Sequence, residues 1–378
     1  MDELIYLDNS ATTALDSRVL QAMLPYFYNN FANPASNHKF GLSVKTEIES
    51  ARDRFATLIN CNSREIIFTS GATEAINIGI KGLVLADKNE RGRIIAIKTE
   101  HKAVLDCCAY LENIGYQVDY FSVDQYGELD IVKLKDSIDD NVVAVCAMLV
   151  NNETGVIHPI KLISEICHAN NAYMICDATQ GFGKLIIDVQ ELGVDLLCLS
   201  AHKFHGPKGS GVLFARNGLD ISSFIHGGGQ ERGLRSGTMN VPGIIGLTIA
   251  AEIAIDEIEI NSRHILNLRK RLESGLLALP ESTLNGHPDN RCQHISNISF
   301  NGLDANTLIQ KMDHLAVSNG SACTSLVFEP SHVLMAMGRD RESAYGSIRF
   351  SIGKYNSNED IDLAINILKN YEFRFKQD

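Results

Sequence analysis

Residues 195–215 read DLLCLSAHKFHGPKGSGVLFA, in which two short apolar runs flank a turn containing glycine and proline. The two runs predict strands over residues 195–199 and 211–215. The turn between them carries polar side chains that begin directly after the first strand. These side chains are therefore expected at the edge of a sheet.

Similar apolar runs recur upstream and alternate with stretches of helical periodicity. After Pro34, for example, apolar residues repeat three and four positions apart from Phe40 to Leu58. Strands that alternate with helices predict an α/β fold whose mainly parallel sheet is covered on both faces. Ligands of such sheets bind beyond the carboxyl ends of the strands. The other predicted strands span residues 65–69, 93–98, 142–148 and 173–177, and predicted helices span residues 73–85, 102–115 and 160–170.

The composition of the 378 residues, 45% hydrophobic and 21% charged, is that of a globular protein and excludes a disordered or fibrous chain. The formal net charge of −12 argues against direct, non-specific DNA binding, while leaving room for a local basic patch that meets a structured RNA. No uncharged apolar run reaches the roughly 18 residues that span a membrane, so no membrane association is expected. The acidic start, MDELIY, lacks the basic region of a signal peptide.

The nine cysteines are odd in number and show no C-x-x-C spacing. Cys146, Cys176 and Cys198 lie within predicted strands, which indicates buried free thiols and a reducing, cytoplasmic location. The twelve histidines form neither an H-E-x-x-H motif nor a Cys/His zinc spacing, so no metal site is expected.

The composition changes near residue 255, where an alanine-rich segment runs into a long charged helix that ends near Pro280. This change predicts a large domain of residues 15–255 and a smaller domain of residues 256–378. The extended N-terminal run from Ile5 to Asp8 is expected to pack with the later part, so residues 1–14 are assigned to the smaller domain.

Two motifs at strand ends suggest binding chemistry. Ser70 and Gly71 lead into Ala72 and Thr73 at a helix start, where backbone N–H groups and a hydroxyl can bind a phosphate. The alternative is a simple helix cap and tight turn. Asp177 ends the strand 173–177, where a carboxylate is costly unless a cation such as a protonated pyridine nitrogen meets it. Capping of the next helix is the alternative there.

Lys203 lies in the turn after the strand 195–199, and a partly desolvated lysine there can form a Schiff base. Ser200 and His202 of the same turn can bind a phosphate. A solvated loop lysine is the usual alternative. The phosphate-binding turn, the acid and the lysine nevertheless follow one another in the order that a pyridoxal phosphate enzyme needs.

Four further features carry candidate chemistry. His101 follows the strand 93–98 and can stack on a flat cofactor, carry protons or only cap the next helix. Cys323 lies in the run SNGSACTS, an exposed setting for a nucleophilic or an incidental thiol. The glycine-rich residues 227–238 offer Arg and Thr side chains to an anion, or only form turns. Arg349 lies in an alternating strand pattern and needs a carboxylate or phosphate partner, which a structural salt bridge would also provide.

Together these motifs resemble the cysteine desulfurases of the IscS/NifS group, within the class V aminotransferase-like, fold-type I pyridoxal phosphate enzymes. The resemblance implies a large domain with a mainly parallel seven-stranded sheet, a smaller α+β domain, pyridoxal 5′-phosphate as cofactor, L-cysteine as substrate and a homodimer. It covers nearly the whole chain in order, through YLDNSATT (6–13), NPAS (33–36), SGATE (70–74), EHK (100–102), NNETG (151–155), DATQ (177–180), HK (202–203), GPKG (206–209), residues 227–238, SACTS (321–325) and SIRFS (347–351).

The resemblance also implies roles for single residues. Lys203 should hold the cofactor covalently, Asp177 should pair with its pyridine nitrogen and Gln180 with its ring hydroxyl. His101 should stack on the ring and carry protons together with the released Lys203. The phosphate should be bound by Ala72, Thr73, Ser200 and His202, joined by Thr238 from a second subunit.

For the substrate, the resemblance assigns Asn152, which also contacts the cofactor, and Arg349, which grips the carboxylate, with Asn33 assisting. Cys323 should attack the substrate sulfur, so that alanine leaves and Cys323 carries a persulfide. Its sulfur would pass to acceptor proteins of iron–sulfur cluster assembly or of tRNA thiolation. Two alternatives are a selenocysteine lyase and a catalytically silent paralogue in a sulfur-transfer complex; the retained Lys203 and Asp177 argue against the second.

The chain departs from the family pattern at two places. Asn319 stands where the family loop often has serine. The sequence ends at Asp378, before the longer tail through which housekeeping members contact the iron–sulfur scaffold protein. The loop around Cys323 resembles the long-loop subgroup, whose persulfide reaches partner proteins.

Overall fold

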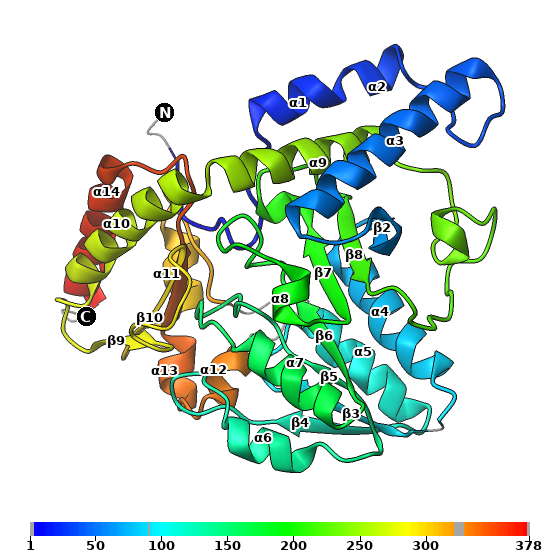
Figure 1. Ribbon diagram of the computed structural model, residues 1–378. Coiled ribbons are helices and arrows are strands. Elements are labelled where there is room, and N and C mark those ends of the chain that lie inside the picture. The colour runs from blue at the N-terminus through cyan, green and yellow to red at the C-terminus, as the bar shows by residue number, and fades with distance from the viewer. Residues whose placement is uncertain (1–3, 90, 321–328, 376–378) are drawn as a thin grey trace.

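The computed structural model describes residues 4–89, 91–320 and 329–375 (Figure 1). Its centre is a seven-stranded sheet with the strand order β2-β8-β7-β6-β5-β3-β4. All neighbours from β7 to β4 are parallel, and β8 is antiparallel to both β7 and β2. This mainly parallel α/β sheet confirms the predicted fold class. The strands are β2 Ile66–Thr69, β3 Arg93–Ile97, β4 Gln117–Phe121, β5 Val142–Cys146, β6 Tyr173–Asp177, β7 Leu196–Ser200 and β8 Gly211–Ala215.

The six predicted strands of this sheet are present, with small differences at their ends. Glu65 is not in β2 but closes a short 3-10 helix, η1 (Ser63–Glu65), because its carboxylate accepts a hydrogen bond from the Asn62 N–H in a capping box. The prediction missed β4 entirely. This edge strand is only partly buried and carries Asp119, which pairs with Arg93 of β3, so its sequence lacks a continuous apolar run.

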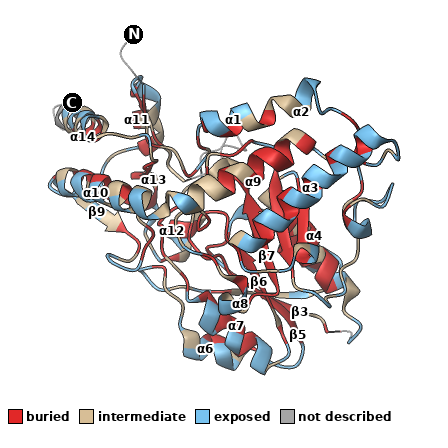
Figure 2. Ribbon diagram, turned by 45° about the horizontal axis from the view of Figure 1, so that its top comes forward, coloured by how far each residue is buried: buried red, intermediate tan, exposed pale blue. Residues whose placement is uncertain are grey.

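Helices cover both faces of the sheet, as predicted. In β3, Ile95 and Ile97 point into one hydrophobic cluster with α3, α7 and α9, while Ile94 and Ala96 point into another with α4 and α5. Figure 2 shows the strands almost wholly buried and the outer faces of the helices exposed. The helices around this sheet are α1 Ser17–Met23, α2 Pro25–Tyr28, α3 Lys39–Leu58, α4 Ala72–Ala86, α5 Lys102–Asn113, α6 Ile131–Ser137, α7 Ile160–Ala169, α8 Val189–Leu192 and α9 Val241–Asp256.

The later part of the chain forms its own hydrophobic cluster, into which Ile5 and Leu7 of the N-terminal segment insert. There β1 (Ile5–Tyr6) pairs in parallel with β11 (Leu315–Ala316). The domain division near residue 255 stays a prediction, which this separate cluster supports. The cluster contains the antiparallel sheet β12-β10-β9, and the elements of this region are β9 Ser282–Asn285, β10 Ile295–Phe300, β12 Ser347–Ser351, α10 Ile258–Leu276, α11 Ala305–Lys311, α12 His332–Ala336, α13 Arg341–Tyr345 and α14 Asn358–Phe375.

Within the described ranges, no helix combines the length and the apolar character that crossing a membrane requires.

A buried ion pair anchors the glycine-rich residues 227–238. Glu231, in the short 3-10 helix η3 (Glu231–Gly233), accepts hydrogen bonds of 2.8 and 2.7 Å from the guanidinium of Arg52 on α3. The same carboxylate accepts the Phe68 N–H of β2 at 2.9 Å. Arg235 pairs with Glu74, so the arginines of this stretch have structural partners.

We expect the substitution Arg52→Met to destabilise the fold by about 3–5 kcal/mol, because it leaves the Glu231 carboxylate buried without its cation. The matched control is Arg54→Met on the same helix, whose partner Glu252 is about one third exposed. That exposed pair should contribute less than about 1 kcal/mol. The urea midpoints of both variants measure the difference, and equal midpoints would contradict the assignment.

Candidate active site

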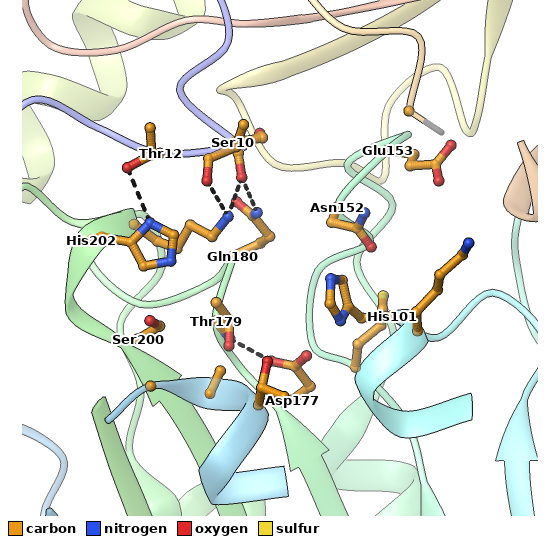
Figure 3. Close-up of a pocket in the computed structure, with 18 of the residues that line it drawn as sticks. Ser10, Thr12, His101, Asn152, Glu153, Asp177, Thr179, Gln180, Ser200 and His202 are labelled. Carbon is orange, nitrogen blue, oxygen red and sulfur yellow. Dashed lines mark hydrogen bonds between the residues drawn. The ribbon is translucent and has the colours of Figure 1, made fainter. Parts of the chain in front are cut away.

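A cavity of about 740 Å³ opens where several strands of the large sheet end (Figure 3). Asp177 ends β6, Ser200 ends β7, and His101 and Met148 follow β3 and β5. The N-terminal residues around Ser10 cover it from the opposite side. The cavity therefore lies beyond the carboxyl ends of the strands, where the sequence predicts a ligand.

The structure gathers ten of the predicted site residues around this cavity. Asn33 does not line it, and its side-chain oxygen instead accepts the Ala35 N–H at 2.9 Å. Thr238 is exposed and lies outside the cavity of a single chain. Cys323 falls outside the described residues. The ten lining residues are Ala72, Thr73, His101, Asn152, Asp177, Gln180, Ser200, His202, Lys203 and Arg349.

Lys203 reaches the cavity from the 3-10 turn η2 (Ala201–Lys203) after β7. The turn closes on itself because the Gly206 N–H donates to the Ala201 carbonyl at 2.9 Å, an approach that a Cβ at position 206 would block. The Lys203 Nζ donates to the carbonyls of Ser10 at 2.5 Å and Ala11 at 2.7 Å. Desolvation, and then the positive charges of Arg349 and Lys184, lower the pKa of Lys203 to about 7. About half of its amines are therefore neutral near pH 7.

The N-terminus of α4 lies beside Ser200. A glycine at position 211 of β8 makes this possible, because a Cβ there would come within 2.5 Å of the Gly71 Cα. His202 flanks the same space, and its Nδ1 lies 3.1 Å from the Thr12 hydroxyl oxygen. Desolvation, followed by nearby lysine charges, lowers the pKa of His202 to about 4, so the ring is neutral at pH 7. Free N–H groups at a helix start, a hydroxyl and a neutral imidazole can together bind a phosphate.

The buried Asp177 carboxylate accepts the Thr179 N–H at 2.9 Å with Oδ1. Behind it lies Glu100, which is fully buried and accepts the Met148 N–H at 2.6 Å. Burial, and then the negative charge of Asp177, hold the pKa of Glu100 well above its usual range. Burial and the neighbouring Asp177 charge thus both favour the protonated form of Glu100.

His101 caps α5 and opens onto the cavity, where its Nδ1 accepts the Ala103 N–H at 3.1 Å. The desolvating surroundings are the largest cause of its lowered pKa, although the charge of Asp177 opposes the shift. The lowered pKa leaves the ring mostly neutral at pH 7. Because Nδ1 accepts a hydrogen bond, Nε2 carries the ring proton and can donate it in a hydrogen bond.

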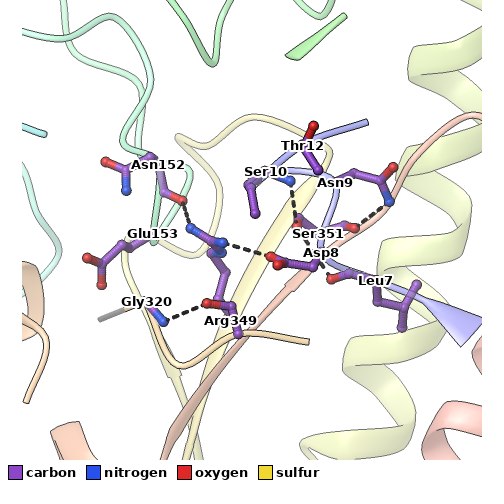
Figure 4. Close-up of polar contacts among 12 residues, drawn as sticks. Leu7, Asp8, Asn9, Ser10, Thr12, Asn152, Glu153, Gly320, Arg349 and Ser351 are labelled. Atoms are coloured by element: carbon purple, nitrogen blue, oxygen red, sulfur yellow. Dashed lines mark hydrogen bonds and ion pairs between the residues drawn. The ribbon is translucent and has the colours of Figure 1, made fainter. Parts of the chain in front are cut away.

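Arg349 of β12 forms the far wall (Figure 4). Its guanidinium donates to the Asn152 carbonyl at 3.0 Å and to the Asp8 carboxylate at 2.8 Å, so Asp8 is the carboxylate partner that the sequence calls for. Among the described residues, the Nε of Arg349 and the Oδ1 of Asn152 are buried without a hydrogen-bond partner. Other atoms of both side chains line the cavity.

Sequence reasoning missed several residues that shape the cavity. Ser10 accepts hydrogen bonds from both Lys203 and Gln180, the latter at 2.9 Å, through its backbone carbonyl, which no side-chain pattern reveals. His294 is fully buried, with its Nε2 3.3 Å from the Gln180 Oε1, and carries no local motif. Glu153 is buried beside Asn152 and accepts the Ser331 hydroxyl; its place in NNETG was the available signal.

These observations fit a flat, anionic, pyridine-containing group such as pyridoxal 5′-phosphate. The start of α4 with Ser200 and His202 matches its phosphate, and Asp177 matches a protonated ring nitrogen. The half-neutral Lys203 amine matches its aldehyde. The described ranges contain no group of three or more His, Cys, Asp or Glu side chains able to hold a metal ion.

Comparison with known proteins also indicates a pyridoxal 5′-phosphate enzyme. The profile of the aminotransferase class-V family matches residues 5–363. A cysteine desulfurase IscS from Rickettsia akari (strain Hartford) is 45% identical over 368 residues, which cover 96% of this chain and 90% of the relative. One from Methanosarcina thermophila is 44% identical and covers 96% of this chain and 91% of the relative. A solved structure of a NifS-like protein superposes with a TM-score of 0.92 at 37% identity, covering 98% of this chain and 100% of the other.

Proposed function

This chain belongs to the aminotransferase class-V family of pyridoxal 5′-phosphate enzymes, and on that premise we propose that it is a cysteine desulfurase. It converts L-cysteine to L-alanine and keeps the sulfur as a persulfide on Cys323. The observation that carries the proposal is one cavity that joins Lys203, Asp177 and Arg349 in a chain 45% identical to a cysteine desulfurase.

Different residues of the chain would hold different parts of the cofactor. Lys203 binds its aldehyde carbon, and Asp177 keeps a proton on its ring nitrogen. His101 covers the ring and Gln180, oriented by Ser10 and His294, donates toward its hydroxyl. The bound cofactor supplies an electron sink that weakens bonds at the α-carbon of an amino acid. The phosphate is held by Ala72, Thr73, Ser200 and His202.

Arg349 and Asn152 would orient the substrate. Both side chains line the cavity, where they can meet the polar groups of bound cysteine. The Arg349 guanidinium itself donates hydrogen bonds to Asp8 and to the Asn152 backbone. These bonds limit its motion and fix the position in which it would bind the substrate carboxylate. The assignment of Asn33 as an assisting residue stays a prediction, since in one chain it lies outside the cavity.

Proton movements fall to Lys203 and His101. With a pKa of about 7, the Lys203 amine can both accept and return a proton near neutral pH. The sulfur step requires a second thiol. The Cys323 thiolate attacks the substrate sulfur, an S–S bond forms, the C–S bond breaks with its electron pair left on carbon, and protonation of that carbon yields alanine.

The persulfide on Cys323 would pass to acceptor proteins, of iron–sulfur cluster assembly or of tRNA thiolation. The relatives named IscS support an acceptor-directed role. A cytoplasmic location is part of the same proposal. The buried free thiols of Cys146, Cys176 and Cys198 support it, because they suit a reducing compartment. Persulfide labelling followed by pull-down identifies the acceptor.

The working unit would be a homodimer, in which Thr238 reaches the cofactor phosphate of the neighbouring chain. Thr238 is exposed and outside its own cavity, and the neighbouring region around α2 exposes Phe27, Tyr28 and Phe31 by 60–67%. Such apolar side chains suit burial against a second copy. Sedimentation should give twice the mass of one 41.6 kDa chain. A fully active monomer would contradict the proposal.

The substitution Arg349→Lys should lower kcat/KM for L-cysteine about ten- to a hundredfold, because lysine keeps the charge but loses the planar, two-pronged contact of about 1.5–3 kcal/mol. Cofactor content should stay unchanged. Arg263→Lys on the exposed face of α10 is the matched control and should behave as the parent. If Arg349→Lys instead lost the cofactor, and added pyridoxal 5′-phosphate restored the parental kcat/KM, Arg349 would be a cofactor ligand.

The substitution Cys323→Ala tests the proposed reaction. The variant should retain the cofactor and change its visible absorbance when L-cysteine is added, because Lys203, Asp177 and Arg349 remain. It should form almost no alanine from cysteine and reductant, since no thiol attacks the sulfur. Cys61→Ala is the control and should remain active, because burial raises the pKa of the Cys61 thiol to about 12. Alanine formation by Cys323→Ala at the parental rate would refute the mechanism.

A further inference from the structure

A second lysine lies directly behind Lys203. Lys184 follows β6 through a turn in which its N–H donates to the Gly181 carbonyl at 3.1 Å. Its Nζ donates to the backbone carbonyl of Lys203 at 2.7 Å. Lys184 does not line the large cavity, but it shares with Lys203 the wall of a separate cavity of about 40 Å³. It thus touches the turn of Lys203 from the side away from the large cavity.

The turn that carries Lys184 is packed tightly against the residue after Lys203. A Cβ at Gly183 would lie 3.2 Å from the Phe204 Cβ and 3.0 Å from the Ala254 Cβ, and Gly183 has a positive φ of 73° that favours glycine. On the other side, the Gln293 side chain donates to the Lys184 carbonyl at 3.0 Å. The position of Lys184 relative to Lys203 is therefore set from two directions.

The part of the chain that the structure describes offers the charge of Lys184 no acidic partner. Among the described residues, no carboxylate lies within ion-pair distance of its Nζ, whereas Lys354 pairs with both Asp16 and Glu257. Desolvation lowers the pKa of Lys184 to about 8, opposed only by the Cys292 thiol, so the group is mostly an ammonium at pH 7. A desolvated cation without a counter-ion is unfavourable. Its retention beside Lys203 points to a role there.

Several charged groups act on the Lys203 amine. Desolvation is the largest cause of its lowered pKa; Arg349 and then Lys184 lower it further, while Asp177 and Asp8 raise it. The histidines near the two lysines, His202, His205 and His294, are neutral at pH 7, because burial lowers the pKa of each. A substrate carboxylate on Arg349 would offset that arginine's charge. Lys184 keeps its charge, because it lies outside the substrate cavity.

We propose that Lys184 is a positioning residue for Lys203: it holds the Lys203 carbonyl and maintains a positive charge behind the turn, which keeps the released Lys203 amine neutral while substrate is bound. The inference rests on the proposed role of Lys203 as the cofactor lysine. A neutral amine can accept a proton, and it can add again to the cofactor aldehyde carbon, with loss of water, when the product leaves.

The test measures how fast the protein recaptures its cofactor as pH varies. The cofactor is removed from the holoenzyme with hydroxylamine, pyridoxal 5′-phosphate is added back, and the second-order rate is followed by visible absorbance. Only the neutral amine reacts, so the rate rises through the pKa of Lys203, near pH 7 in the parent. Titrations of the cofactor itself are common to all variants, so a change of midpoint reports on Lys203.

Lys184→Met and Lys184→Gln both remove the charge, and both should move this midpoint upward by about half a pH unit or more, since loss of a nearby like charge raises the pKa of an amine. The glutamine variant can still donate a hydrogen bond, so it remains informative if the methionine variant folds poorly. Lys184→Arg keeps the charge and should return the midpoint toward the parent. Lys161→Met, on the exposed face of α7, removes an equal charge and should leave it unchanged.

An unshifted midpoint in both neutral variants would overturn the inference. Borohydride reduction of each holoenzyme, followed by peptide mapping, separates this outcome from failure of the proposed function. Label on Lys203 with an unshifted midpoint refutes only the role of Lys184. Label on another residue, such as Lys208, refutes the assignment of Lys203 itself.

Discussion

Two hydrogen bonds from the Lys203 amine to the carbonyls of Ser10 and Ala11 join the N-terminal segment to the end of the large sheet. The segment is held along its length, because Thr13 donates to the His202 carbonyl and Ser10 donates to the Ser351 hydroxyl. One short N-terminal run, which turns at residues 9–11, therefore spans from β7 to β12 and closes the cavity between them. The geometry of the active site depends on this run as much as on the sheet.

Charge in the cavity is divided between its ends. Arg349 supplies positive charge where an amino acid carboxylate is expected, and Lys203 supplies an amine where an aldehyde is expected. Asp177 supplies negative charge at the strand end, and it raises the pKa of the buried Glu100 behind it. Burial also keeps His202 neutral, so it can contact a phosphate without adding a positive charge. Desolvation is the largest cause of the shifted pKa values of Glu100, His202 and Lys203. It follows from the depth of the cavity below the helices and the N-terminal run.

The sequence alone determined the α/β class, six of the seven strands of the large sheet and ten residues of the cavity wall. The strands and several wall residues follow from a local pattern, in which an apolar run ends and a polar residue follows at the sheet edge. Asp177, Ser200 and Lys203 are all read in this way. Asn152 and Gln180, in contrast, were expected only from the family resemblance. The edge strand β4 was not predicted, because a strand that is buried on only part of one face has no continuous apolar run.

Only the tertiary structure decided which distant groups meet. The backbone carbonyls of Ser10 and Ala11 and the buried His294 have no sequence signature, since their effect depends on contacts across more than a hundred residues. Lys184 is only 19 residues from Lys203 in the chain, but no local pattern shows that its amine reaches the Lys203 carbonyl. The structure also showed that Thr238 and Asn33 stand outside the cavity of one chain. A pKa is set by desolvation and by charges from several elements at once. Sequence therefore identified Lys203 as a candidate, and the folded surroundings set its proton affinity.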